Sequence, residues 1–331
     1  MTTRTRSLDT FQAYLVFAAM FLLCFAMTSA RAGTSAFDTL FPTIGKRPAV
    51  VPGEFVITPF GYFHPSCVLQ LAEGNTLLAD GRVQRPNGTT EAARRCDHPH
   101  YTSDGTAVPA ENKAGDVSPP VISGWLESVS ATTTGSFSKL TSTWIVPPEP
   151  TTDNGQLLYF FPGFEDIGHV ISILQPVMQW GVGFAGGGPY WTAASWNCCI
   201  SGNTWHSRLI DLNVGDTILG TISSTCGPGP SCPTWNVVTK NRTTGERTTL
   251  ARSQVNGQVW DWVFGAVAEP YGVVACTDFP NNSGLTFTVR VYDENGDLTI
   301  PDWHGDRWIG NPNPQCDFGT AFTNTKASVR Y

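Results

Sequence analysis

Short runs in which apolar and polar residues alternate, or in which apolar residues follow one another, fill the chain from about residue 121 onward. Gly, Pro and Asn separate the runs, and no run keeps a helical period. About nine runs of strand length at short spacing predict an all-β fold, an antiparallel β-sandwich or jelly roll. The runs are 124–130, 141–147, 156–164, 170–181, 190–198, 216–224, 234–241, 262–273 and 285–293.

A glutamine interrupts the apolar run "ILQPVMQW" at 173–180. Alternation along a strand places Gln175 and Gln179 on one face, and Leu174 and Trp180 on the other. A buried amide without partners costs roughly 1 to 3 kcal/mol. Gln175 is therefore expected either to make structural hydrogen bonds or to face a cleft in which it has a function.

A second polar residue, Glu269, interrupts the run 262–273. Alternation places it on the same face of its strand as Val267 and Tyr271. A carboxylate among apolar neighbours is costly unless it is paired. In the simplest structural interpretation, Gln175 and Glu269 satisfy backbone groups or each other and do nothing more.

The N-terminus has the pattern of a secretion signal over residues 1–32. Basic residues precede an apolar run at 13–27, and the cleavage motif "ARA" follows at 30–32. The apolar run is shorter than the ~20 residues of a membrane-spanning helix, although an uncleaved anchor is the alternative. We therefore expect a secreted chain that begins near Gly33 and makes no membrane contact after cleavage.

Residues 33–120 differ in pattern from the rest of the chain. They hold Cys67 and Cys96, and they end in the polar run "DGTAVPAENKAGDVSPP" at 104–120, which is typical of a linker or a processing site. After the signal peptide, the sequence therefore predicts two parts. The first is a prosegment or small accessory module at 33–120, and the second is a β-sandwich domain at 121–331.

The composition suits short strands joined by tight turns, with 33 Gly, 24 Pro and only 14% charged residues. A net charge of -7 offers no basic surface for a phosphate backbone, which argues against a nucleic-acid partner. The chain lacks G-x-S-x-G, H-E-x-x-H and P-loop motifs, so the usual hydrolase signatures are missing. We expect a monomer.

Eight cysteines follow the signal peptide, and an even number in a secreted chain predicts disulfides. Cys226 and Cys232 bracket a short loop and are expected to pair. The four other cysteines of the β-sandwich domain are then expected to pair among themselves: Cys198, Cys199, Cys276 and Cys316. The segment "CDHPH" at 96–100, with His64, could be drawn as a zinc site, but its spacing fits no common pattern. We expect neither a metal nor a cofactor.

Six segments resemble, in their order, the motifs of the glutamic peptidases, the eqolisin family of acid endopeptidases. They are "TSTWIVPPEP", "FFPGFED", "ILQPVMQWG", "PYWTAASW", "LNVGDTI" and "VAEPYGV", and they fall within about residues 124–278. The resemblance implies that Gln175 and Glu269 form a catalytic dyad. It also implies a secreted acid endopeptidase with a polypeptide substrate, and a prosegment at 33–120.

The resemblance further implies a substrate-binding set around the dyad: Phe161, Glu165, Gln179, Trp180, Tyr190 and Trp196. Several positions depart from the family's pattern. Phe161 stands where a Trp is usual, Glu165 and Gln179 each stand for an Asp, and Ser195 stands for a Glu. Groups that surround a dyad set its orientation and pKa, so these departures bear on both the activity and the pH optimum.

Under this interpretation, Glu269 takes a proton from water and later returns it to the leaving amine. The amide of Gln175 donates a hydrogen bond to the oxyanion of the tetrahedral intermediate. The alternative is a non-catalytic, secreted β-sandwich that binds carbohydrate or protein through an aromatic face, since the chain is rich in Trp.

Overall fold

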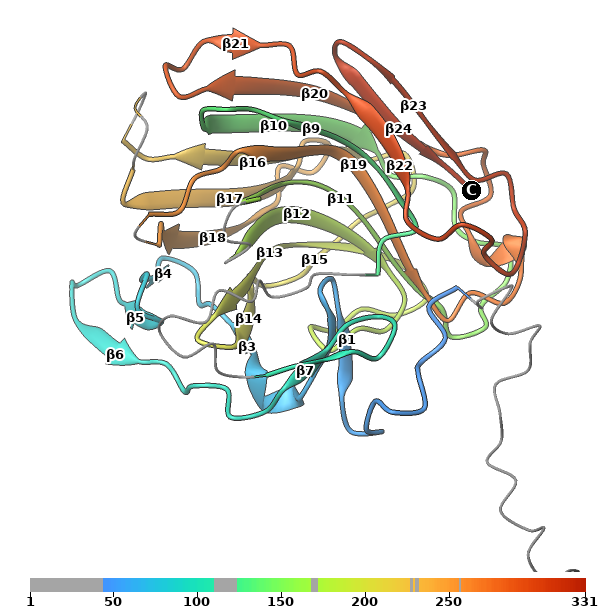
Figure 1. Ribbon diagram of the computed structural model, residues 1–331, viewed down its shortest axis with the longest axis horizontal. Helices are drawn as coiled ribbons and strands as arrows, with labels where there is room; N and C mark the ends of the chain where they lie inside the picture. Colours follow the sequence, from blue (N-terminus) through green and yellow to red (C-terminus); the bar gives the residue numbers. More distant parts are fainter. Residues whose placement is uncertain (1–43, 110–123, 168–171, 227–228, 230–231, 256) are drawn as a thin grey trace, which may run out of the picture. The chain divides into compact units, whose positions relative to one another are not determined.

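Two large β-sheets, built mainly from antiparallel strands, pack face to face in the computed structural model (Figure 1). The structure describes residues 44–109, 124–167, 172–226, 229, 232–255 and 257–331, which lie in one compact unit. The predicted all-β, antiparallel sandwich is confirmed, and each of the nine predicted runs overlaps a strand. The predicted signal peptide and residues 110–120 of the predicted linker lie outside the described residues.

The first large sheet has eleven strands, in the order β23-β24-β20-β10-β16-β17-β18-β4-β5-β6, with β21 paired to β20. Its strands are β23 (Gly319–Thr323), β24 (Lys326–Arg330), β20 (Leu285–Asp293), β10 (Phe137–Ile145), β16 (Thr217–Ser224), β17 (Thr234–Asn241), β18 (Arg247–Ser253), β4 (Thr76–Leu77), β5 (Arg82–Gln84), β6 (Thr90–Ala92) and β21 (Leu298–Thr299).

The second large sheet has nine strands, in the order β22-β9-β19-β11-β12-β13-β14-β3, with β15 paired to β13. Its strands are β22 (His304–Arg307), β9 (Glu127–Thr132), β19 (Trp262–Tyr271), β11 (Leu157–Glu165), β12 (Ile173–Trp180), β13 (Trp191–Ile200), β14 (Asn203–His206), β3 (Val68–Gln70) and β15 (Ile210–Asp211). Two short 3₁₀ helices, η1 (Pro65–Cys67) and η2 (Cys276–Asp278), complete the described elements together with a third, smaller sheet.

The main hydrophobic core lies between the two large sheets. Leu140 and Trp144 of β10 meet Phe160 of β11 and Leu174 and Met178 of β12 there. Alternate residues of the nine-stranded sheet point the opposite way, to the face called the outer face below. These residues form a second cluster that does not belong to the main core.

Residues 44–109 cover the outer face, and we call them the N-terminal cover. They form the small sheet β1 (Val56–Thr58), β2 (Gly61–Phe63), β7 (His100–Tyr101) and β8 (Ala107–Val108), drawn in blue to teal along the lower side of Figure 1. The cover also extends both large sheets, because β3 pairs in parallel with β14 and β4 pairs in parallel with β18. Its strands are therefore part of the sandwich's hydrogen-bonded framework.

Four disulfides use all eight cysteines of the described residues. Cys226 pairs with Cys232 as predicted. The other four of the β-sandwich domain pair among themselves, as Cys198–Cys199 and Cys276–Cys316. Cys67 pairs with Cys96, so this bridge begins and ends within the N-terminal cover. No disulfide joins the described residues before 110 to those after 123.

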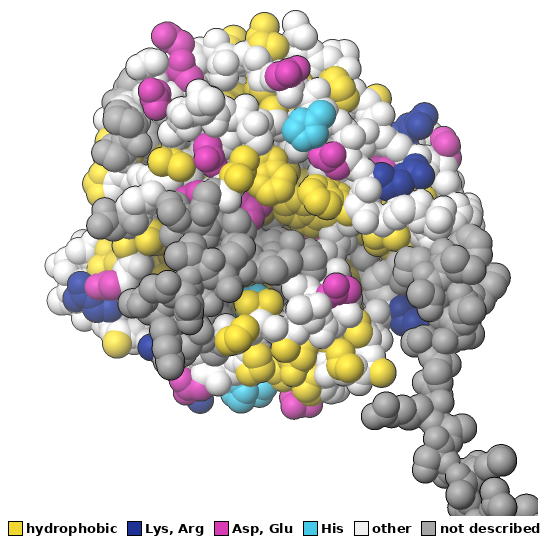
Figure 2. Space-filling model, viewed as in Figure 1, with side chains coloured by type: hydrophobic (Ala, Val, Ile, Leu, Met, Phe, Trp, Pro, Cys, Tyr) yellow, Lys and Arg dark blue, Asp and Glu magenta, His cyan; other side chains and the backbone are white. Residues whose placement is uncertain are grey.

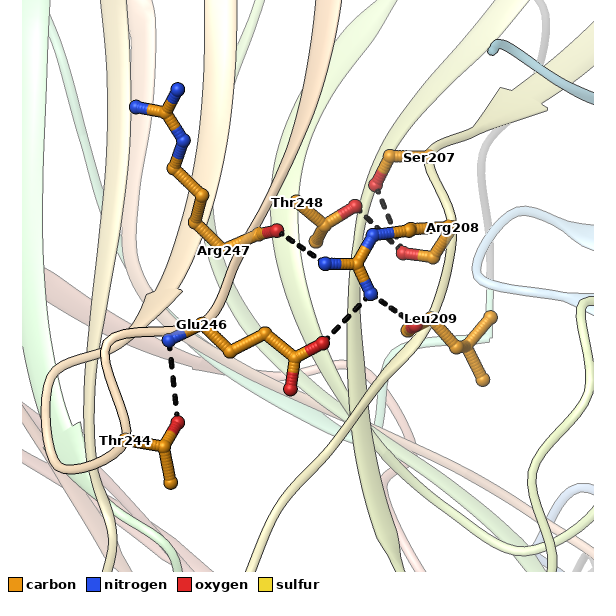
Figure 3. Close-up of polar contacts among 7 residues, drawn as sticks. All are labelled: Ser207, Arg208, Leu209, Thr244, Glu246, Arg247 and Thr248. Atoms are coloured by element: carbon orange, nitrogen blue, oxygen red, sulfur yellow. Dashed lines mark hydrogen bonds and ion pairs between the residues drawn. The ribbon is translucent and has the colours of Figure 1, made fainter. Parts of the chain in front are cut away.

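Arg208 links the nine-stranded sheet to the β17–β18 hairpin of the other sheet (Figure 3). Its guanidinium donates to the Glu246 carboxylate at 2.8 Å and to the Arg247 carbonyl at 3.0 Å. Its own carbonyl accepts from the Thr248 hydroxyl at 2.7 Å. The ion pair is exposed and contributes about 0 to 1 kcal/mol, so it positions the hairpin more than it stabilises the fold.

Hydrophobic side chains gather in the middle of the face shown in Figure 2, and acidic side chains border them. Half-exposed Trp308 is one aromatic residue of the molecular surface, and its ring packs edge-on against Trp125 at 5.8 Å between centroids. Among the described residues, no helix has the length and apolar composition of a membrane span. The same residues hold no group of three or more His, Cys, Asp or Glu side chains arranged for a metal ion.

Candidate active site

The polar residues that interrupt the predicted strands, Gln175 and Glu269, lie on the outer face of one sheet, on strands β12 and β19 with β11 between them. β19, β11, β12 and β13 follow one another in the nine-stranded sheet. Gln175 of β12 pairs with Trp196 of β13, and Glu269 of β19 pairs with Tyr159 of β11. Trp196 and Tyr159 belong to the outer cluster, and directly paired residues share a face.

Gln175 is fully buried, and neither polar atom of its side chain has a hydrogen-bond partner among the described residues. The side chain lies against β11 at Gly163, where an added Cβ would meet the Gln175 Cγ at 3.4 Å. In the described part of the chain, neither the backbone nor Glu269 donates to or accepts from the Gln175 amide, which does not fit the simple structural interpretation. An orphaned, buried amide of this kind calls for an explanation in function.

Glu269 is also fully buried, in a pocket lined by tyrosines. Its Oε1 accepts a hydrogen bond from the Tyr271 hydroxyl at 2.6 Å, whereas its Oε2 has no partner among the described residues. The hydroxyl of Tyr159 is likewise buried without a partner, and the Glu269 charge acts on both Tyr159 and Tyr62. Burial holds the pKa of Glu269 well above its usual value.

The register does not bring Gln175 and Glu269 side by side. Glu269 is level with Tyr159, and Tyr159 is level with Gln179, four residues along β12 from Gln175. The two side chains are thus separated by about 13 Å along the strands and by two strand spacings of about 5 Å each. The direct partnership of Gln175 and Glu269 that the sequence resemblance implies therefore stays a prediction.

A different carboxylate lies beside Gln175. Glu165, the last residue of β11, pairs with Ile173 of β12 and with Trp262 of β19. Ile173 belongs to the outer cluster, and Trp262 packs against it, which places Glu165 on the outer face. Its exposed fraction is 2%, and burial raises its pKa to about 8.

Phe161 and Trp196, two of the predicted substrate-binding residues, lie on the outer face and are buried under the cover. Gln179 lies on the same face, but its amide is engaged in structure, donating to the carbonyls of Gly181 and Gly186. Tyr190 is 43% exposed just before β13 begins.

Trp180 is the exception, because it points into the main core. It pairs with Trp191 across β12 and β13, and the two rings pack at 5.3 Å. Strand alternation puts it on the face opposite to Gln175, so it cannot line the same groove as that amide. The motif resemblance included Trp180, whereas the alternation within its own strand excluded it.

The N-terminal cover closes the outer face. The ring of Phe60 packs on Trp196 at 6.1 Å, and that of Tyr62 packs on Tyr271 at 5.8 Å. The Gly45 carbonyl accepts a hydrogen bond from the Gly272 amide at 3.0 Å. At this contact the chains lie so close that a Cβ on Gly45 would stand 2.3 Å from the Tyr271 Cα. A polypeptide substrate could reach Gln175 only after the cover moves.

The tyrosines around Glu269 were not assigned a role from the sequence. Tyr271 was placed on the same face as Glu269 by alternation, and Tyr159 could have been found in the same way within the run 156–164. Tyr62 comes from the cover, more than 200 residues earlier, and no local pattern links it to Glu269.

A Ser130–His304–Asp306 group at the β9–β22 edge does not form a nucleophilic triad. The Ser130 hydroxyl lies 3.1 Å from His304 Nε2, and the Asp306 carboxylate lies 3.3 Å from the same nitrogen. A catalytic triad needs the acid on one ring nitrogen and the nucleophile on the other.

No protein-family model matches the chain, and a search of curated proteins returns no match. Among solved structures the chain is similar to scytalido-glutamic peptidase with a peptide-based transition-state analogue, at 16% identity and a TM-score of 0.44, covering 62% of this chain and 98% of that chain. The chain is also similar to SCP-B, a member of the eqolisin family in complex with the tripeptide Ala-Ile-His, at 16% identity and a TM-score of 0.44, covering 62% of this chain and 98% of that chain. Aspergilloglutamic peptidase from Aspergillus niger shows 17% identity and a TM-score of 0.36, covering 53% of this chain and 98% of that chain. Likenesses of this strength do not assign a function, which has to come from the residues of the outer face.

Proposed function

We propose that the chain is a secreted endopeptidase that hydrolyses peptide bonds at the outer face of its nine-stranded sheet. The observation that carries the proposal is Gln175, a fully buried amide whose two polar atoms have no partner within the part of the chain that the structure describes. An unmade pair of hydrogen bonds destabilises the fold by roughly 1 to 3 kcal/mol for each group. A catalytic role explains why the sheet keeps this amide and surrounds it with apolar residues.

The amide suits peptide hydrolysis because it is neutral and can donate. Its Nε2 group can hydrogen-bond the oxyanion that forms when water attacks the carbonyl carbon, and one preorganised donor of this kind is worth roughly 3 to 4 kcal/mol of the barrier. A carboxylate must activate the water and protonate the leaving amine. Two buried carboxylates share the face with Gln175: Glu269, which the sequence motif singles out, and Glu165.

The N-terminal cover is proposed to act as a prosegment. It blocks Trp196 and Tyr271 with aromatic side chains, and it contains both ends of its own disulfide. A cut between residues 109 and 124 would therefore leave it held by non-covalent contacts alone. Secretion is part of the same proposal, supported by the signal-like N-terminus and by four disulfides.

Cleavage of denatured casein tests the proposal. The purified chain is incubated from pH 3 to pH 8 with pepstatin present, and the mature N-terminus is sequenced at each time point. Pepstatin-insensitive cleavage that accompanies loss of residues before about 120 is the expected result. No cleavage at any pH, together with retention on polysaccharide, would instead support the non-catalytic binding protein.

A further inference from the structure

We propose that the Tyr271 hydroxyl positions Glu269 for peptide hydrolysis: it holds Oε1 of the carboxylate and leaves Oε2 as the oxygen that exchanges a proton with water. This inference rests on the proposed function, with Glu269 as the carboxylate that the sequence motif singles out. Tyr271 acts through Glu269, so it is a positioning residue and not a catalytic one.

The contact between the two residues is short and buried. The Tyr271 hydroxyl donates to Glu269 Oε1 at 2.6 Å, and both residues are at most 1% exposed. Glu269 Oε2 has no partner among the described residues. A hydrogen bond to an ionised group is roughly twice as strong as one between neutral groups, so the phenol favours one orientation of the carboxylate. Oε2 is then the oxygen that is left to bind water or a leaving amine.

The backbone of β19 places the two side chains on one face. Glu269 and Tyr271 are two residues apart on this strand, so alternation directs both to the outer face. Pro270 lies between them, and its ring fixes the backbone angle φ. The Tyr271 ring packs against Tyr159, which is the partner of Glu269 on β11, at 6.3 Å between centroids. The arrangement is therefore built from β19 and β11 and does not require the N-terminal cover.

Gly124 leaves room for this hydrogen bond. A Cβ at position 124 would stand 2.5 Å from Glu269 Oε1 and 2.6 Å from the Tyr271 hydroxyl oxygen. Both distances are too short for a real Cβ, so a side chain there would push the carboxylate and the phenol apart. Gly124 also has a φ of +126°, a backbone angle that residues with side chains rarely adopt. The chain thus has a glycine where a side chain would break the contact.

The hydrogen bond opposes the effect of burial on Glu269. Burial raises the pKa of Glu269 well above its usual value, and the Tyr271 hydroxyl lowers that pKa by favouring the ionised form. The other titratable groups of the described residues that face Glu269 are Tyr159 of β11 and Tyr62 of the cover. Neither of these hydroxyls has a hydrogen-bond partner among the described residues, and Arg47 of the cover lies over the Tyr62 ring at 4.8 Å. Of the three tyrosines, Tyr271 is therefore the one that helps Glu269 to stay ionised at lower pH.

The proposed step balances in protons and electrons. Glu269 Oε2 takes one proton from water while the water oxygen bonds to the carbonyl carbon of the peptide, and the displaced electron pair moves to the carbonyl oxygen. Oε2 then gives the same proton to the amide nitrogen as the C–N bond breaks. One water molecule is consumed, Glu269 ends as a carboxylate, and Tyr271 keeps its own proton throughout.

The test compares the pH profile of kcat/KM for Tyr271→Phe and for the wild type, both as the full chain, with casein as the substrate. The substitution removes only the hydroxyl. On the acidic side of the profile, kcat/KM is expected to fall roughly 10-fold to 100-fold, which corresponds to one hydrogen bond to a charged group. The acidic limb should move to higher pH, because Glu269 then needs a higher pH to ionise, and the loss should become smaller as the pH rises.

Tyr331→Phe is the matched control for a purely structural loss. Tyr331 is a buried tyrosine of the main core, and its hydroxyl donates to Asn282 Oδ1 at 3.0 Å. This variant should lose thermal stability but keep the acidic limb of the wild type. Tyr159→Phe should also keep the limb, because the Tyr159 hydroxyl makes no hydrogen bond to Glu269. Thermal unfolding checks that each variant is folded.

The outcomes separate this inference from the proposed function. A limb that stays in place in a folded Tyr271→Phe variant, or that moves equally in Tyr331→Phe, overturns the role of Tyr271 and leaves a working peptidase. No cleavage by the wild-type chain at any pH overturns the proposed function itself, and this inference with it.

Discussion

At the scale of single residues, the outer face combines groups that are individually destabilising. The Gln175 amide has no hydrogen bond to any described residue, and Glu165 and Glu269 are carboxyls held in surroundings that disfavour their charge. Buried groups with perturbed pKa values cluster at functional sites more often than elsewhere. The neutral amide is suited to stabilising an oxyanion, because a second ionised group at the same place would repel it.

Gln175→Glu is expected to abolish casein cleavage while the fold is kept. The substitution is isosteric, but it replaces the donor Nε2 by an acceptor and places a second acid next to Glu165. Loss of one preorganised donor corresponds to about a 100-fold to 1,000-fold fall in kcat. Steady-state kinetics and a thermal melt measure the two properties separately, and unchanged kcat in a folded Gln175→Glu variant would contradict the role of the amide.

Glu165 also predicts a pH dependence of stability. Its pKa is about 8 in the folded chain and near 4.5 in the unfolded chain, so between these values the folded state holds a proton that the unfolded state has lost. Rising pH therefore favours unfolding across this window. Relative to Glu165→Gln, which cannot ionise, the wild type should lose on the order of 4 kcal/mol between pH 4.5 and pH 8. Urea midpoints of both proteins across that range measure the difference, and parallel curves would exclude the raised pKa.

At the scale of elements, the alternation of residues along a strand correctly predicted which side chains share a face of the sheet. It could not predict the register in which neighbouring strands pair. The pattern of β12 put Gln175 and Trp180 on opposite faces, as the structure has them. Whether Gln175 is level with Gly163 or with Tyr159 depends on how β11 pairs with β12, which no single strand encodes. The closeness of Glu165 to Gln175 follows from that pairing alone.

The strands of the N-terminal cover could not be predicted from the sequence, for a different reason. They are two or three residues long, too short for alternation to be recognised. Their positions are set by aromatic contacts with distant strands, such as Phe60 on Trp196. The positions of the cysteines, in contrast, were sufficient to predict that the six cysteines of the β-sandwich domain pair among themselves.

His100 makes the cover sensitive to acid. It is buried in β7, it stacks on Phe63 at 4.6 Å, and burial lowers its pKa to about 4. Between pH 6.5 and pH 4 the unfolded cover binds a proton that the folded cover excludes, so the stability of the cover is lost as the pH falls through this window. Hydrogen exchange of β2 and β7 should therefore quicken on acidification. His100→Phe should remove most of this effect, whereas a variant of exposed His304 should keep it.

At the scale of the whole molecule, the cover and the sandwich are joined by strand pairing, by other backbone hydrogen bonds such as that from Gly272 to Gly45, by aromatic packing and by the chain between residues 109 and 124. The chain itself is a covalent link, and no disulfide of the described residues adds a second one. Both carboxylates and the amide are buried, so the described form is expected to be inactive. Activity should appear in proportion to the fraction of chains cut in the linker.

Weakening the cover should have the same effect as cutting the linker. Phe60→Ala removes the ring that packs on Trp196 and should raise casein cleavage by the uncut chain, because the cover opens more often. Phe322→Ala is a suitable control, since Phe322 is an exposed aromatic on β23 of the other large sheet. Equal activity of the uncut Phe60→Ala chain and the uncut wild type would show that the cover does not limit access.

The Cys67–Cys96 disulfide has a consequence for the cover after it is released. Because this disulfide joins two residues of the cover, the cover that a cut in the linker produces can dissociate as an intact, folded fragment. The same fragment can also bind again. Binding of the fragment to the sandwich domain then depends on their concentrations. At high concentration the fragment stays bound and the enzyme is inhibited, whereas dilution after secretion releases the fragment and the enzyme becomes active.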